Sequence, residues 1–104
     1  MREIKTEEEL EQLLRESEKR LVILDFFAEW CGPCKKAMPV FHTIAEANEE
    51  ILCVKVNVDE SEGIAGNFEI NGLPTFILLK GGVEVEQFMG PNLDPLRAAI
   101  EKYK

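Results

Sequence analysis

The chain has little of several residue types that functional sites commonly need. Its 104 residues include one histidine, one tryptophan and three cysteines, and 20 aspartates and glutamates outnumber its 12 lysines and arginines. The net charge of −8 argues against nucleic acid or an anionic membrane as a partner, because either would require a basic patch. The simplest interpretation of the acidic surplus is that it keeps the protein soluble.

Long apolar runs are also absent. No run approaches the ~20 residues that a membrane-spanning helix needs, and Met1–Glu8 is too acidic and polar for a signal or transit peptide. We therefore expect a cytoplasmic protein, in a compartment where disulfides are transient and catalytic. With 45% apolar and 31% charged residues and no linker or repeat, residues 1–104 should form a single domain, which we expect to be monomeric.

The order of the hydrophobic segments predicts an α/β fold. Strands are expected at residues 2–5, 21–27, 51–58, 75–80 and 83–89, and helices at 6–19, 34–48, 60–67 and from Asp94, the expected N-cap of the last helix. Gly81-Gly82 predicts a hairpin between the last two strands. Because crossovers between parallel strands are right-handed, the helices should cover both faces of a central mixed sheet.

Two cysteines stand where a buried strand gives way to a helix, in the segment Trp30-Cys31-Gly32-Pro33-Cys34-Lys35. This context makes Cys-x-x-Cys a redox motif. A helix N-terminus offers free N–H groups and partial positive charge, so Cys31 should ionise readily. Cys34 lies about one turn further on, close enough to form a disulfide with Cys31.

One acid interrupts the apolar strand that precedes the cysteines. By alternation, Asp25 shares a face with Ile23 and Phe27, where a charge is costly, so it should hold its proton more firmly than a free aspartate. The residues alone leave a second interpretation open, in which Asp25 reaches solvent or a backbone N–H. Cys53, in the next strand, is most simply a small core residue, with a regulatory thiol as the alternative.

The chain resembles the thioredoxin family over nearly its whole length. Asp-Phe-Phe-Ala-Glu followed by Trp-Cys-Gly-Pro-Cys-Lys is similar to the family's active-site segment. Further matches recur in family order and spacing at Pro39, Lys55–Asp59, Gly72–Thr75, Lys80–Gly82 and Met89–Gly90. The resemblance implies the thioredoxin fold, a central mixed sheet of β-α-β-α-β followed by a β-hairpin and a C-terminal helix.

The resemblance also implies a function and its residues. It implies a protein-disulfide reductase in which Cys31 attacks the substrate disulfide and Cys34 resolves the mixed disulfide. Asp25 would assist proton transfer, Lys55 would approach and tune Asp25, and Pro74 would follow a cis peptide bond. The redox-active disulfide would be the only redox group, since no nucleotide fingerprint occurs, and an NADPH-dependent flavoprotein thioredoxin reductase would regenerate the dithiol.

The expected substrates are disulfide-containing proteins bound at a shallow apolar surface. The matching positions are Trp30, Gly32, Pro33, Leu73, Pro74, Gly90 and Pro91. The backbone at Leu73 could pair with an extended substrate segment. Two positions depart from the family pattern: Phe27 stands where many bacterial members have tryptophan, and Pro91 stiffens a position that is commonly small and flexible.

Three other functions compete with disulfide reduction. The cysteines and His42 form a nominal Cys₃His zinc set, but His42 lies eight residues from Cys34 on one helix, about 12 Å away. A non-catalytic binding module could use the same groove. An oxidase or isomerase could share the fold, although Gly-Pro between the cysteines resembles the reductases.

Overall fold

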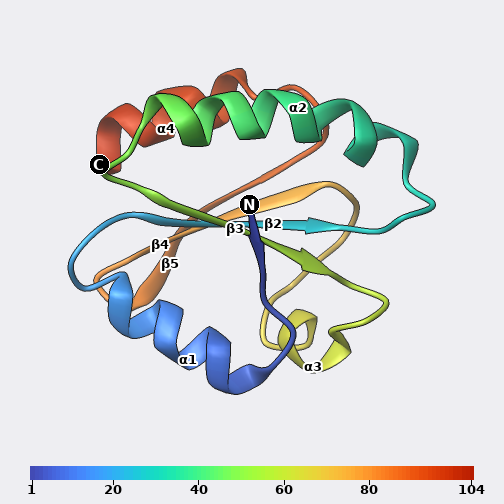
Figure 1. Ribbon diagram of the computed structural model, residues 1–104, viewed down its shortest axis with the longest axis horizontal. Coiled ribbons are helices and arrows are strands. Elements are labelled where there is room, and N and C mark those ends of the chain that lie inside the picture. The colour runs from blue at the N-terminus through green and yellow to red at the C-terminus, as the bar shows by residue number, and fades with distance from the viewer.

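The computed structural model describes residues 1–104 as a central sheet between two layers of helices (Figure 1). The strands are β1 (Arg2–Glu3), β2 (Val22–Phe27), β3 (Leu52–Asn57), β4 (Thr75–Lys80) and β5 (Val83–Met89). The helices are α1 (Glu7–Glu16), α2 (Gly32–Ala47), α3 (Glu62–Ala65) and α4 (Asp94–Tyr103). None of these helices is long and apolar enough to cross a membrane.

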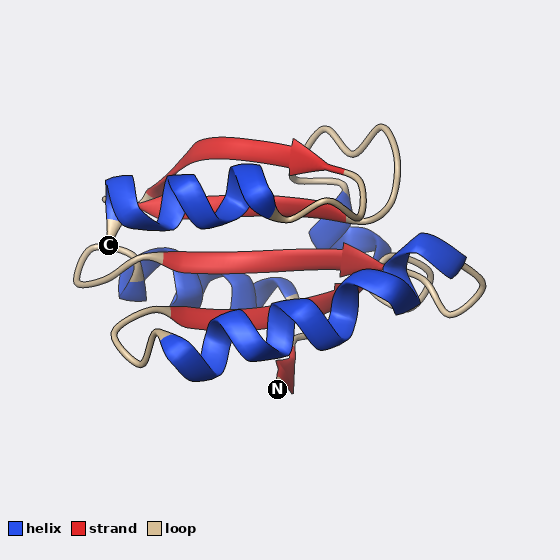
Figure 2. Cartoon of the chain, turned by 90° about the horizontal axis from the view of Figure 1, so that it is seen from above, coloured by secondary structure: helices blue, strands red, loops and turns tan.

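The five strands form one mixed sheet in the order β1-β3-β2-β4-β5, seen from above in Figure 2. β3 pairs in parallel with β1 and β2, whereas β4 pairs antiparallel with β2 and β5. Gly81 and Gly82 both have positive φ in the tight turn between β4 and β5, as a two-residue hairpin requires. The predicted fold class is confirmed.

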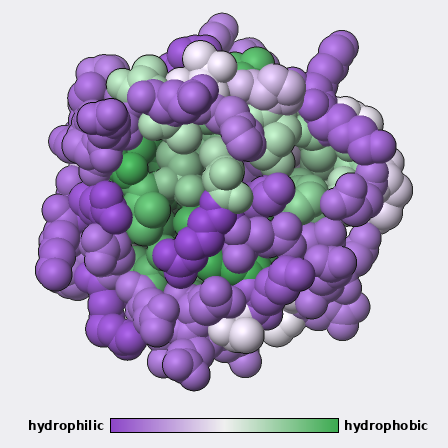
Figure 3. All heavy atoms as spheres, in the orientation of Figure 1, coloured by the Kyte–Doolittle hydropathy of each residue, from purple (hydrophilic) through white to green (hydrophobic).

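The core has two layers because β2, the central strand, is buried on both faces. One layer packs α2 and α4 on the sheet around Phe41, Phe76 and Leu96. The other packs α1 and α3 on the opposite face around Leu13, Phe26 and Ile64. Figure 3 shows apolar residues gathered in the middle of one face, where the sheet lies between the helical layers, with hydrophilic residues around them.

Helix boundaries differ from the predicted ones where side chains or backbone cap the ends. The helix expected from Cys34 begins at Gly32, because Cys31 itself is the N-cap and its Sγ accepts the Cys34 N–H. The expected N-cap Asp94 is instead the first residue of α4; its N–H donates to Asn92 Oδ1, so that Leu93 takes the cap position. A capping box between Thr6 and Glu9 fixes the start of α1.

Candidate active site

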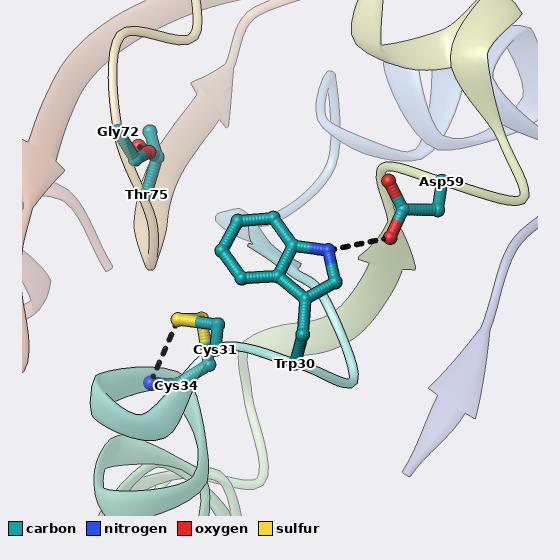
Figure 4. The surroundings of a disulfide bond; sticks show 6 residues. All are labelled: Trp30, Cys31, Cys34, Asp59, Gly72 and Thr75. Atoms are coloured by element: carbon teal, nitrogen blue, oxygen red, sulfur yellow. Dashed lines mark hydrogen bonds between the residues drawn. A yellow bond between two sulfur atoms is a disulfide. The ribbon is translucent and has the colours of Figure 1, made fainter.

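The two cysteines lie at the carboxyl end of β2, where open α/β sheets place their sites. They are joined as a disulfide, with Cα atoms 5.3 Å apart. Cys34 N–H donates to Cys31 Sγ over 3.2 Å, drawn as a dashed line in Figure 4. In the reduced protein, this N–H and the helix dipole favour a thiolate at Cys31.

Solvent exposure does not distinguish the two cysteines. In the disulfide form Cys31 is 4% exposed and Cys34 is 3% exposed. The exposed residues around them are Trp30, Gly32 and Pro33. What distinguishes the cysteines is therefore position, because only Cys31 caps the helix.

Asp25 lies buried on the central strand, 1% exposed, and its Oδ1 has no hydrogen-bond partner. Burial raises the pKa of this carboxyl to about 7, partly opposed by the positive charge of Lys55. Lys55 stands directly opposite Asp25 in the parallel register of β2 and β3. The interpretation in which Asp25 reaches solvent is therefore wrong, and Lys55 lies beside Asp25 on the neighbouring strand, where its charge acts on the carboxyl.

Cys53 lies on the same strand as Lys55 and is half-buried against the α2–α4 layer of the core. Burial, together with the negative charge of Asp25, raises the pKa of its thiol to about 12. A thiol that stays protonated is a poor nucleophile. These properties favour a core residue over a regulatory thiol.

The loop before β4 lies across from the disulfide. The Leu73–Pro74 peptide bond is cis, and Leu73 packs against the cluster that holds both cysteines. Figure 4 shows Gly72 and Thr75 on the side of the disulfide opposite α2. The backbone N–H and carbonyl of Leu73 make no hydrogen bond within the chain, so both are free to pair with another strand.

Gly90 and Gly32 occupy the rim of the site for different reasons. Gly90 has φ +105°, a conformation that favours glycine, and its N–H donates to the Pro74 carbonyl over 2.8 Å. A Cβ at Gly32 would meet nothing within 4 Å. Crowding inside the molecule therefore does not require glycine at position 32, and the space above it is open to another chain. Pro91 is exposed next to Gly90.

One contact at the site was not foreseen from the sequence. Trp30 is 72% exposed, and its indole N–H donates to Asp59 Oδ2 over 2.8 Å (Figure 4). β2 and β3 run in parallel, and Phe27 lies opposite Asn57 at their carboxyl ends. The residues that follow these two strands therefore lie close together. The sequence held no signal for this contact, because it depends on the register between β2 and β3, which forms only when the sheet assembles.

The four candidate zinc ligands do not come together. No three side chains of histidine, cysteine, aspartate or glutamate are grouped so as to hold a metal ion. His42 is exposed on α2, and two of the cysteines are bonded to each other. The side chains of the three cysteines and His42 therefore do not form the tetrahedral ligand set that a Cys₃His zinc site requires.

The site combines a disulfide whose first cysteine caps the N-terminus of α2 with a buried acid on the central strand. These features define the class of protein as a thiol–disulfide oxidoreductase. Comparisons with known proteins agree. The family model described as Thioredoxin matches residues 2–102. The chain is 34% identical over 101 residues to horse thioredoxin, covering 97% of this chain and 96% of that protein.

Two further relatives extend the comparison. The chain is 41% identical to Drosophila melanogaster thioredoxin-T over 96% of this chain, which spans 64% of that longer protein. The crystal structure of Fasciola hepatica thioredoxin superposes with a TM-score of 0.95 at 39% identity, covering all of both chains. The chain belongs to the thioredoxin family, and the Cys31–Cys34 pair is its redox-active group.

Proposed function

We propose that this protein is a cytoplasmic reductant of protein disulfides that keeps protein thiols reduced and passes electrons to reductive enzymes. The observation that carries the proposal is the Cys31–Cys34 pair at the start of α2, with only Gly-Pro between the cysteines. We infer that residues 1–104 act as a single monomeric domain. An NADPH-dependent flavoprotein thioredoxin reductase would return the oxidised pair to the dithiol.

The first chemical step forms a bond between enzyme and substrate. The Cys31 thiolate attacks one sulfur of the substrate disulfide, and the substrate's S–S bond breaks as the Cys31–substrate bond forms. The departing substrate sulfur leaves as a thiolate and takes a proton. The hydrogen bond from Cys34 N–H and the helix dipole stabilise the attacking form of Cys31.

The second step releases the substrate. Cys34 loses its proton and attacks Cys31 Sγ, so that the Cys31–Cys34 disulfide forms as the Cys31–substrate bond breaks. The second substrate sulfur leaves as a thiolate and takes a proton. Two electrons have then passed to the substrate. Asp25 is suited to take the Cys34 proton, directly or through a water molecule, because its pKa of about 7 leaves it partly ionised at neutral pH. Lys55 would tune this equilibrium.

Substrate binding would use the backbone and the apolar surface beside the disulfide. An extended segment can pair with the free backbone groups of Leu73. The open space over Gly32 lets that segment approach the sulfur. Next to Leu73 lies an apolar hollow of about 390 Å³, suited to an aliphatic or aromatic substrate side chain. Pro33, Gly90 and Pro91 would belong to the apolar surface around the disulfide.

We expect Trp30 to cover the bound segment, with its indole ring held in place by the hydrogen bond to Asp59. In Asp59→Ala the indole loses its partner, so the fluorescence anisotropy of this single tryptophan should fall. The KM for protein disulfides should rise about 2- to 5-fold, the effect of one hydrogen bond, with kcat little changed. Glu60→Ala is the matched control, because it removes a neighbouring exposed acid that does not contact Trp30. Equal effects in both variants would contradict the role.

The test of the function is the reduction potential of the Cys31–Cys34 pair, measured by equilibration in defined thiol–disulfide buffers. We expect a value near about −270 mV, that of a thioredoxin-type reductant. A value of about −120 to −180 mV would instead indicate an oxidant or isomerase. A variant with both cysteines replaced by serine that retained full biological activity would favour a non-catalytic binding module.

A further inference from the structure

The side chains of Phe27 and Lys55 meet in a pocket beside the resolving cysteine. The Lys55 ammonium lies 5.6 Å from the centroid of the Phe27 ring, within the ~6 Å over which a cation is attracted to an aromatic face. Cys34 and Met38 line the same pocket, which has a volume of about 180 Å³. The chemistry described above gives Phe27 no role.

The position of Lys55 needs an explanation, because a lysine ammonium is strongly hydrated and its stem is flexible. Lys55 is half-buried and opposite Asp25 in the register of β2 and β3. Phe27 lies two residues beyond Asp25 on the same face of β2, so its ring is a diagonal neighbour of Lys55. The face of the Phe27 ring therefore attracts the Lys55 ammonium to a position near the Asp25 carboxyl.

We propose that Phe27 is a positioning residue for disulfide exchange: its ring face holds the Lys55 ammonium in the pocket beside Cys34, where the cation acts on the Asp25 carboxyl. An aromatic face suits this task because it attracts the ammonium without neutralising it. A carboxylate at the same position would pair with Lys55 and cancel its effect on Asp25. The inference rests on the proposed proton transfer by Asp25.

The charged groups around Asp25 are few enough for one cation to matter. Cys53 and Lys55 come from β3, and β4 presents Phe76, which carries no charge. Cys34 and the exposed Lys35 of α2, with the exposed Glu29 of the preceding loop, line the pocket. Among these, Lys55 is the cation that opposes the effect of burial on Asp25.

The test is a titration of the Asp25 carboxyl, followed through the ¹³C NMR signal of its Cγ in the oxidised protein. Lys55→Met should raise the pKa of Asp25 by about one unit, and Phe27→Leu by about half as much, because the cation is lost or released. In the double variant the pKa should equal that of Lys55→Met alone, since the ring acts through the lysine. Phe27→Tyr keeps the ring face and should titrate like the wild type.

A second measurement and a control variant complete the test. The pH profile of disulfide reduction should move upward in Phe27→Leu by the same amount as the titration. Phe68→Leu is the matched control: it removes an equal ring on the opposite face of the sheet, where Phe68 packs against Phe26, and should leave Asp25 unchanged.

Two results would overturn the proposal. One is a shift in Phe27→Leu that is equally large with and without Lys55, which would mean that the ring acts through burial alone. The other is no shift at all in Phe27→Leu. Because the titration needs no substrate, a wild-type protein that failed to reduce disulfides would be recognised separately as a failure of the proposed function.

Discussion

Replacing Cys34 with serine should turn the protein into a trap for its substrates. Cys31 would still attack, but the mixed disulfide could not be resolved and should accumulate as a covalent complex with a disulfide-containing protein. In Cys31→Ser the rate of disulfide reduction should fall to the uncatalysed rate and no complex should form. This variant lacks the nucleophilic sulfur at the start of α2. Non-reducing electrophoresis and mass spectrometry of the conjugate measure both outcomes.

Cys53→Ser is the matched control for these variants. Its half-buried thiol, with a pKa raised to about 12, should form no conjugate, and activity should match the wild type. Addition of a small dithiol should reduce the mixed disulfides trapped by Cys34→Ser and release the substrate. Mixed disulfides that accumulated equally in Cys31→Ser and Cys34→Ser would refute the assignment of attacking and resolving roles.

Replacing Asp25 with asparagine should stabilise the folded protein above pH 7 by up to about 4 kcal/mol, because one unit of pKa corresponds to about 1.4 kcal/mol. The carboxyl has an ordinary pKa of 3.8 that burial raises to about 7 in the fold. Between these values the folded state holds a proton that the unfolded state releases. The free energy of unfolding of the wild type should therefore fall as pH rises through this window, and the variant should lack this fall.

Denaturant unfolding of the oxidised protein at several values between pH 4 and pH 9 measures this difference. The two proteins should approach each other toward pH 4, because Asp25 in the unfolded state begins to bind a proton as the pH nears its ordinary pKa of 3.8. Asp94→Asn is the matched control, since it makes the same substitution at an exposed aspartate at the start of α4. A parallel pH dependence in Asp25→Asn and wild type would contradict the raised pKa.

The cost of Asp25 is itself informative about function. A carboxyl that is 1% exposed, with an oxygen lacking any partner, destabilises the fold at neutral pH. Natural proteins retain such groups mainly where chemistry needs them. We therefore expect Asp25→Asn to exchange activity for stability, with slower release of the mixed disulfide.

Local patterns were enough to predict most of the elements. The apolar run of β2, interrupted only by Asp25, predicted a buried strand, and Gly81-Gly82 predicted the hairpin between β4 and β5, because both signals lie within a few residues of the feature they specify. Helix ends were less predictable. Sulfur capping by Cys31 moved the start of α2 by two residues, since the cap depends on a rotamer and not on a pattern.

The sequence by itself determined the alternation of strands and helices, the spacing of Cys31 and Cys34, and the presence of an acid within the apolar strand. Each depends on residue type and on spacing within one element, which short-range sterics and hydrophobic burial fix. Only the tertiary structure decided which side chains meet: Trp30 with Asp59, and Lys55 with both Asp25 and Phe27. Those contacts join residues on different strands, and the register between strands arises only when the whole sheet assembles.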